Sequence, residues 1–592
     1  MNRICVFVLF MCIFCVSSLR LGPRVKTDQG ITHYTTKHSQ SGLRKLVRST
    51  SSGIIWVGDD ENLFPVTSTR DIQVNVAQFK DECKENEKCE SKHTISLISD
   101  GVDGNLLFMC GTNGEKTKCY NMNLDYSLVD GFEFTYELNM NDPSLLIGDM
   151  LYCKSTLGLY QINRKTGAKI WPYSPVAEQK YVKLVAGNGQ DKDKVYSFFT
   201  EKHRSDNGGS EFDTWIPRVS QICMNDKGGS KDVLPFSWTS MIYTRLSCGA
   251  PELSFTQLID VATVDNDTKI YALFRNIWNM SAVCVYKMTE ISRIFSSSKF
   301  MEIKNMKLPV NHRPGQCVDD STRLSPDILR FMKERPEVKD SVMPVNKPLL
   351  FKHHHYTHIQ VQRLENRTVL FLALESGEIH KVLENPTDDP VFIIAEFRPF
   401  PNVTHISSML LDESEKRLYV SFGTEVIHID LQRCDLYGDQ CEQCLLSRDP
   451  YCGWNGSRCT HVSENSIQDI QFCNSTKVIH SRTEIAATAP VLIISPSSRY
   501  YLHCPIISNH ASYHWYHGNT QVDCVRADQD CLYLIESMKK SHEGLYRCVS
   551  SEDNYHININ RYELSMSSSP ALTVNTIVLP CLLLLLFTHL LL

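Results

Sequence analysis

The stretch from Cys441 to Trp454 reads Cys-Glu-Gln-Cys-Leu-Leu-Ser-Arg-Asp-Pro-Tyr-Cys-Gly-Trp, and it lies within six cysteines that span Cys434 to Cys473. In an oxidising compartment such a dense cluster indicates a small domain held together by disulfides. Zinc is the alternative for Cys441 and Cys444, but no second matching pair follows at the usual spacing. We therefore predict a compact cystine-rich domain here.

The long segment before this cluster repeats a loose unit, in which an apolar strand with an aromatic residue is followed by a polar turn and a second strand. Seven copies begin at Ile54, Leu106, Met150, Lys194, Lys269, Val369 and Arg417. A period of about 45 residues is typical of propeller blades. Seven blades close into a ring, which eliminates exposed sheet edges. The wider gaps after the fourth and fifth copies predict insertions.

One of these insertions contains a predicted helix, from Ser325 to Arg335. Pro326 suits a first helical position, and Ile328, Leu329 and Met332 share one face. Loops and insertions of this kind commonly carry partner-binding surfaces. The segment from Lys202 to Asp213 is a second candidate of the same type.

The pattern after the cystine-rich cluster is that of an immunoglobulin domain. Cys504, Trp515 and the Tyr546-Arg547-Cys548 run match a disulfide between two sheets, a tryptophan packed on it and a tyrosine corner. Cys524 and Cys531 are close enough in sequence for a local extra bridge.

The two ends of the chain predict the compartment. A basic start and a short apolar run indicate a secretory signal peptide over residues 1–18. Small residues at Ser567 to Ser569, a short spacer and the apolar tail Ile577 to Leu592 resemble a glycosylphosphatidylinositol (GPI) signal, with attachment at Ser567 or Ser568. A short transmembrane tail is the alternative. Either way, the body of the protein is expected to face the outside.

An extracellular location is compatible with six N-glycosylation sequons. They are Asn266, Asn279, Asn366, Asn402, Asn455 and Asn474. The many cysteines also agree with an extracellular location. Nine of them lie between Cys83 and Cys317, and because nine is odd, one thiol in that segment is left without a partner for a disulfide within it.

Composition and motifs exclude several other classes. The formal net charge of −6 argues against nucleic-acid binding, which depends on Lys and Arg. Zinc-protease, hydrolase-elbow and phosphate-loop motifs are absent, so we expect no enzyme activity and no cofactor. The run His353-His354-His355 with His358 is the best metal candidate. In a strand only His353 and His355 would share a face, so we favour surface or pH-sensitive packing.

The chain resembles the semaphorin family over nearly its whole length. The Cys441 to Trp454 run resembles the plexin–semaphorin–integrin (PSI) knot. The stretches from Pro217 to Gly229, Asn276 to Cys284 and Arg313 to Cys317 resemble signatures of the sema propeller. The domain order is similar to that of the class 7, GPI-anchored semaphorins.

The resemblance implies a mainly β protein with a seven-bladed sema propeller, a disulfide-rich PSI knot and an immunoglobulin-like β-sandwich. The expected segments are residues 1–18 (signal peptide), 40–432 (propeller), 433–475 (PSI), 485–566 (immunoglobulin-like) and 567–592 (removed GPI signal).

The resemblance also implies disulfide pairings. With the immunoglobulin pairs, the expected bridges are Cys83–Cys89, Cys110–Cys119, Cys223–Cys317, Cys248–Cys284, Cys434–Cys452, Cys441–Cys473, Cys444–Cys459, Cys504–Cys548 and Cys524–Cys531. Cys153 is then the leftover thiol, and its apolar strand favours a buried, inert side chain over an intermolecular bridge.

The function implied by the resemblance is that of a GPI-anchored ligand that forms a homodimer and binds a plexin receptor, with C-class plexins favoured. Axon guidance and growth, cell migration and immune modulation are the family's roles. Class 7 members also resemble integrin ligands through an Arg-Gly-Asp, but this position reads Met224-Asn225-Asp226 here, which makes integrin binding doubtful. The alternatives are a matrix or integrin adhesion protein without plexin dependence, and a propeller glycosidase, which would need clustered carboxylates in the channel.

Overall fold

The structure is a computed structural model of the chain. It describes residues 22–567 except 36–41, 43–44, 67–73, 76–93, 114–115, 136–137, 156, 174–177, 204–213, 251, 304–305, 310–311, 352, 366, 385–390, 401, 403, 474–488 and 528. The predicted signal peptide and nearly all of the predicted GPI signal lie outside the described residues. The chain forms two compact units, Met1–Gln468 and Asp469–Leu592.

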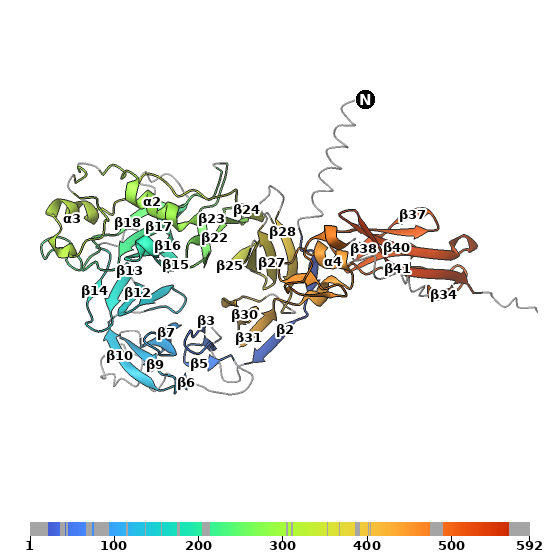
Figure 1. Cartoon of the computed structure of the whole chain (residues 1–592), viewed down its shortest axis with the longest axis horizontal. Coiled ribbons are helices and arrows are strands. Elements are labelled where there is room, and N and C mark those ends of the chain that lie inside the picture. Colours follow the sequence, from blue (N-terminus) through green and yellow to red (C-terminus); the bar gives the residue numbers. More distant parts are fainter. Residues whose placement is uncertain are drawn as a thin grey trace, which may run out of the picture. The chain divides into compact units, whose positions relative to one another are not determined.

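In the described residues, the first unit is built mainly from seven sheets arranged in a ring (Figure 1), and their strands pair antiparallel with one exception near the N-terminus. The first strand of each sheet contacts the first strand of the next, and the last of these contacts the first again, which closes the ring. The prediction of a mainly β protein with a propeller is therefore confirmed.

The sheets follow one another along the chain, and the innermost strand comes first in each. Their strands are β3 (Lys45–Arg48), β4 (Ile55–Gly58), β5 (Asn62–Pro65) and β6 (Val74–Asn75); β7 (Thr94–Asp100), β8 (Leu107–Thr112), β9 (Thr117–Met122) and β10 (Leu128–Phe134); β11 (Ser144–Ile147), β12 (Met150–Ser155), β13 (Gly158–Asn163) and β14 (Lys169–Ile170); β15 (Gln179–Ala186), β16 (Lys194–His203), β17 (Thr214–Cys223) and β18 (Ile242–Arg245); β21 (Gln257–Val264), β22 (Lys269–Arg275), β23 (Ser281–Lys287) and β24 (Leu349–Phe351); β25 (Tyr356–Leu364), β26 (Arg367–Leu374), β27 (Ile379–Glu384) and β28 (Phe392–Phe397); and β29 (Ser408–Asp412), β30 (Arg417–Phe422) and β31 (Glu425–Asp430).

The N-terminal segment completes the last two sheets. Strand β2 (Ile31–Thr35) pairs antiparallel with β31, and β1 (Val25–Thr27) pairs parallel with β28. We expected the propeller to start at residue 40, but it begins earlier, because both of these N-terminal strands belong to its sheets. The last sheet has only three strands of its own, so an N-terminal strand must supply the fourth.

All seven repeats found in the sequence become the second strand of a sheet, namely β4, β8, β12, β16, β22, β26 and β30. A second strand lies between the neighbouring blades, so both of its faces are covered. In β8, for example, Leu107, Phe108, Met109 and Cys110 are all fully buried. This is why these strands read as continuous apolar runs rather than as alternating patterns.

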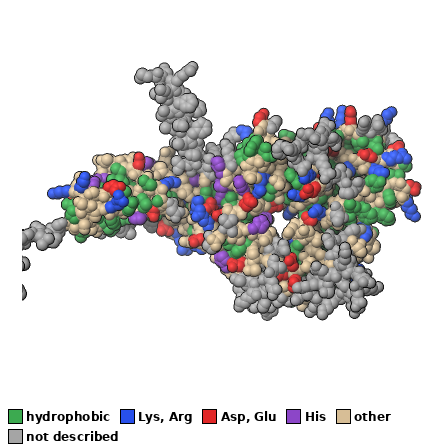
Figure 2. All heavy atoms as spheres, turned by 180° about the vertical axis from the view of Figure 1, so that it is seen from behind, with side chains coloured by type: hydrophobic (Ala, Val, Ile, Leu, Met, Phe, Trp, Pro, Cys, Tyr) green, Lys and Arg blue, Asp and Glu red, His purple; other side chains and the backbone are tan. Residues whose placement is uncertain are grey.

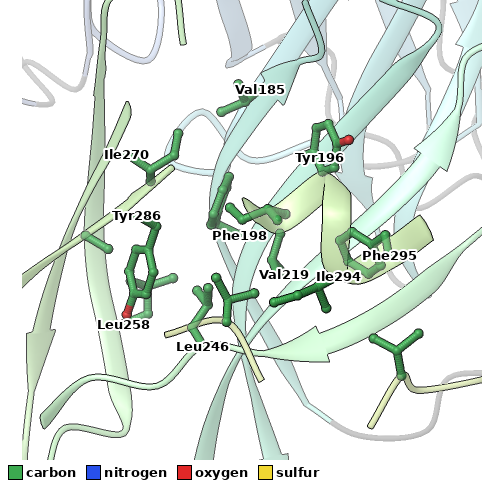
Figure 3. Packing of buried hydrophobic residues seen from close by; sticks show 14 of the residues in the cluster. Val185, Tyr196, Phe198, Val219, Leu246, Leu258, Ile270, Tyr286, Ile294 and Phe295 are labelled. Atoms are coloured by element: carbon green, nitrogen blue, oxygen red, sulfur yellow. The ribbon is translucent and has the colours of Figure 1, made fainter. Parts of the chain in front are cut away.

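The two longest gaps contain insertions, as predicted. The first holds the short strands β19 (Gly249–Ala250) and β20 (Leu253–Ser254), and the second holds α2 (Met288–Ser297), η3 (Ser321–Arg323) and α3 (Pro326–Lys333). The helix expected from Ser325 is confirmed, and the Ser325 hydroxyl accepts a hydrogen bond from the Ile328 N–H. Sequence reasoning did not predict α2, whose Ile294 and Phe295 pack on Phe198 and Val219 (Figure 3).

The cystine-rich knot packs on the sheet of β27 through a buried ion pair. The knot contains η4 (Cys434–Tyr437), α4 (Cys441–Leu446), β32 (Cys452–Trp454) and β33 (Cys459–His461). Lys381 Nζ lies 2.6 Å from Asp449 Oδ2, and both side chains are 1% exposed. The same carboxylate accepts a hydrogen bond from the Tyr437 hydroxyl at 2.6 Å, and Nζ lies 4.1 Å from the centre of the Tyr451 ring.

The second unit contains a β-sandwich with sheet orders β34-β41-β40-β36-β37 and β35-β39-β38. Its core holds Trp515 and the Cys504–Cys548 disulfide, as the immunoglobulin pattern predicts. The elements are η5 (Ile470–Phe472), β34 (Val491–Ile494), β35 (Tyr500–Leu502), β36 (Ser512–His517), β37 (Thr520–Asp523), β38 (Val525–Ala527), β39 (Asp530–Ile535), η6 (Lys540–His542), β40 (Gly544–Glu552) and β41 (Tyr555–Met566). In the part of the chain that the structure describes, no helix is long and apolar enough to cross a membrane.

Candidate functional site

The structure brings together the roots of the two segments that the sequence singled out for partner binding. One is the hairpin of β16 and β17, whose strands pair from Lys194 and Cys223 to His203 and Thr214. The other is the chain that leaves α3. Arg335, just after α3, donates a hydrogen bond of 3.1 Å from Nη1 to Glu201 Oε1 near the end of β16. Residues 204–213 of the predicted hairpin segment lie outside the described residues.

A cluster of shared ion pairs fixes this junction. Arg218 on β17 lies 2.7 Å from Glu201 through Nε and 2.9 Å from Glu337 through Nη1. Arg245 on β18 lies 2.8 Å from Glu337. Glu201 and Glu337 therefore each face two arginines, and both carboxylates are largely buried. Pairs that are partly withdrawn from water and share partners hold one geometry better than isolated surface pairs do.

Tyr243 on β18 also supports the junction. The Arg335 guanidinium carbon lies 4.8 Å from the centre of the Tyr243 ring. Burial opposes the charge of Arg335, but Tyr243 and Glu201 together favour it more strongly, so the pKa of Arg335 is raised. The guanidinium remains charged, and α3 is tied to the hairpin over the whole physiological pH range.

The rim around this junction carries two lysines, each placed over an aromatic ring. Lys333 of α3 places Nζ 4.5 Å from the centre of the Tyr173 ring, and Lys180 places Nζ 4.4 Å from that of Trp215. Figure 2 shows basic and hydrophobic side chains side by side at the end of the propeller that carries α3. Aromatic residues are enriched where protein partners bind, and Tyr173 is 49% exposed here, so this is the best candidate surface in the described part of the chain.

The integrin-loop position has a structural role. Asp226 is buried, and its carboxylate accepts hydrogen bonds from the N–H and hydroxyl groups of Thr239 and Ser240 and from the Gly228 N–H, at 2.7–2.9 Å. We expected this carboxylate to be what remains of a contact motif. The structure shows instead that it points inward and organises the loop after β17.

The histidine run is also placed differently from our expectation of a strand. His353, His354 and His355 precede β25, and only His358 belongs to it. His354 packs edge-on against His380, with ring centres 4.8 Å apart. Burial lowers the pKa of His358, although the Asp260 charge acts in the opposite direction. Among the described residues there is no group of three side chains suited to a metal ion.

Seven of the nine expected cysteine pairs are disulfides in the structure. They are Cys110–Cys119, Cys223–Cys317, Cys248–Cys284, Cys434–Cys452, Cys444–Cys459, Cys504–Cys548 and Cys524–Cys531. Cys441 and Cys473 are each disulfide-bonded as well, and Cys83 and Cys89 lie outside the described residues. Cys153 is a buried free thiol on β12, and burial raises its pKa to about 12.

Four predicted sequons lie in the described chain, at Asn266, Asn279, Asn402 and Asn455. Asn366 and Asn474 lie outside it. Of the two candidate lipid-attachment residues, Ser567 directly follows β41 and Ser568 is outside the described residues.

Comparison with known proteins identifies the family. Family models match in three places: the Sema domain over residues 255–413, the Plexin repeat over 433–479, and the immunoglobulin-like domain of semaphorins 3, 4 and 7A over 487–576. Semaphorin-7A of Homo sapiens is 30% identical over 563 residues, which covers 88% of this chain and 83% of that protein. The chain belongs to the semaphorin family. Semaphorin-7A of Mus musculus is also 30% identical, with 92% of this chain and 87% of that protein covered.

Solved structures show the same fold. Drosophila Semaphorin 2a superimposes with a TM-score of 0.71 at 17% identity, covering 93% of this chain and 99% of that one. A chain from the structure of Drosophila Plexin A in complex with Semaphorin 1b gives a TM-score of 0.59 at 20% identity and covers 77% of this chain and 100% of that one.

Sequence reasoning missed the ion cluster and the Lys381–Asp449 pair. The cluster joins residues from 201 to 337, and no local pattern relates them. Lys381 did leave a signal, because a lysine within the otherwise apolar strand Ile379–Glu384 must find a partner if the strand is buried.

Proposed function

We propose that this semaphorin is an extracellular, GPI-anchored ligand that acts as a homodimer and binds a plexin receptor through the surface formed by the β16–β17 hairpin and α3. The observation that carries the proposal is the Glu201–Arg335 junction. It fixes a rim of lysines and aromatic rings on an insertion that does not take part in closing the ring of sheets.

Family membership supports the plexin part of the proposal, since a related semaphorin is described in a complex with a plexin. A homodimer would hold two receptors together, so the second binding event becomes intramolecular and the apparent affinity rises. The PSI knot, locked to β27 by Lys381 and Asp449, would give the propeller a rigid base. No chemistry on substrates is needed for this mechanism.

The anchor part of the proposal depends on the C-terminal sequence. Strand β41 ends at Met566, so lipid attachment at Ser567 or Ser568 would leave almost no spacer after the immunoglobulin-like domain. Release of the protein from cells by phosphatidylinositol-specific phospholipase C is the expected result. Retention after this treatment would favour the alternative of a short transmembrane tail.

The test of plexin binding uses the secreted ectodomain, residues 19–566, and a panel of plexin ectodomains that includes the C class. Charge reversal of Arg330 and Lys333 together should weaken binding at least about tenfold, which corresponds to the loss of about 1.4 kcal/mol from an energetic anchor, a role in which arginine is enriched. Lys192→Glu is the matched control. Lys192 is exposed and lies just before β16, at the opposite end of the same strand.

Each outcome discriminates between hypotheses. Equal loss of binding with Lys192→Glu would mean that overall charge, and not the α3 rim, governs binding. A folded dimer that ignores every plexin and supports integrin-dependent cell spreading would favour the adhesion alternative.

A further inference from the structure

The turn between β22 and β23 is held rigidly by one side chain. Asn276 Oδ1 accepts hydrogen bonds from the N–H groups of Trp278 at 3.0 Å and Met280 at 2.9 Å. The Asn276 N–H donates to the Met280 carbonyl, and the Asn279 N–H donates to the Asn276 carbonyl, both at 3.1 Å. Asn279 has φ +59°, a left-handed conformation that asparagine tolerates well. These hydrogen bonds stabilise the backbone of the turn in this conformation.

This rigid turn holds two large apolar side chains in solvent. Ile277 is 81% exposed and Trp278 is 62% exposed. No ring contact involves Trp278 among the described residues. Two adjacent apolar side chains held in water on one turn form a small apolar patch, and covering the indole ring would be favourable.

Asn279, the residue after Trp278, is a candidate site for a glycan that could cover the indole ring. Asn279, Met280 and Ser281 form a sequon, and Asn279 is exposed, with no hydrogen-bond partner for its side-chain amide in the described chain. Ser281 is 1% exposed, and its hydroxyl accepts a hydrogen bond from the Tyr356 N–H at 3.1 Å. The sequon hydroxyl is thus sequestered in the folded protein, so a glycan on Asn279 would have to be transferred before this blade is complete.

We propose that the first N-acetylglucosamine of a glycan on Asn279 packs its apolar C–H face against the Trp278 indole ring. The occupant of this apolar tip is then the protein's own carbohydrate. Adjacency favours the glycan over a second copy or a receptor, because Asn279 and Trp278 share one rigid turn, and a sugar on Asn279 would stand in the way of any protein partner. The proposal rests on passage through the secretory pathway, which is part of the proposed function.

The experiment measures hydroxyl-radical oxidation of Trp278, read by peptide mass spectrometry, in the full chain expressed in mammalian cells. Asn279→Gln should raise the oxidation rate of Trp278 about twofold, since a sugar covers one face of a ring that is otherwise open on both. Trimming the glycans to a single N-acetylglucosamine should retain the protection. Phe236 is the matched control, because it is also 62% exposed and has no sequon beside it. Its rate should not change.

Two results would overturn the proposal. One is an unmodified Asn279 in a chain whose other sequons carry glycans, which would leave the secretory location intact. The other is an unchanged Trp278 oxidation rate in Asn279→Gln together with loss of the dimer in Trp278→Ser, which would make the tip a protein contact.

Discussion

Replacement of Lys381 by methionine tests whether the knot is locked to the propeller by the buried ion pair. The variant keeps most of the length of the side chain but leaves the Asp449 carboxylate, 1% exposed, without a cation in salt-bridge contact; its described hydrogen-bond donors are then the Tyr437 hydroxyl and the Tyr451 N–H. Removing one partner of a buried pair costs about 3–5 kcal/mol. An unfolding entropy of about 2.1 cal/mol/K per residue over roughly 450 residues then gives a melting temperature about 3–5 °C lower.

Differential scanning calorimetry of the ectodomain measures this shift. Arg330→Met is the matched control, because it breaks the Asp327–Arg330 pair, whose side chains are 82% and 61% exposed, and should change the melting temperature by less than about 1 °C. The double variant Lys381→Met with Asp449→Leu removes both charges and should recover part of the loss. Recovery is incomplete because the buried Tyr437 hydroxyl, Tyr451 N–H and Leu431 carbonyl lose their partners. If Lys381→Met melts within about 1 °C of the unmodified protein, the buried charge is compensated elsewhere and the reasoning is wrong.

Three further predictions concern titratable groups. Burial, aided by the charge of Lys183, lowers the pKa of Lys45 to about 8. Below pH 8 the buried ammonium group therefore destabilises the fold. Lys45→Met should raise the melting temperature at pH 7, and this gain should vanish towards pH 10.5. Burial acts to raise the pKa of Glu396, but hydrogen bonds such as that from His380 lower it to about 2. The ionised Glu396 therefore stabilises the fold above pH 4.5, and this stabilisation is lost on acidification towards pH 2. Glu396→Gln should lower the melting temperature at pH 7 and remove this part of the acid sensitivity. Cys153, with a pKa near 12, should resist iodoacetamide at pH 8 until the protein is unfolded.

Much of the propeller was predictable because its second strands are buried on both faces. A run such as Leu106 to Met109 must be apolar whatever lies beside it, so the repeat survives in the sequence without any knowledge of the neighbouring blades. The innermost strands were not found in this way. In β15 the pairing slips between Tyr181 and Lys183, and such a bulge breaks the alternation of side chains on which a sequence pattern depends.

The candidate site was predictable only in part. The helix after Ser325 has a local cap and an apolar face, and both are visible in the sequence. The position of this helix on the propeller is not visible in the sequence, because it depends on the contact between Arg335 and Glu201 on β16, which lies 134 residues earlier. Pairing between charged residues so far apart follows from the path of the whole insertion, which no local preference specifies.

Three surfaces of the propeller differ in what they offer to a partner. Asp226 faces inward and its carboxylate is saturated by hydrogen bonds, so this residue presents no anionic group to a partner. The tip at Trp278 adjoins a sequon, and carbohydrate there would keep proteins away. The α3 rim is held rigidly by Glu201 and has no described sequon beside it. A rigid surface with no described sequon beside it can bind a partner at little cost in conformational entropy, which makes this rim the first place to look for the receptor.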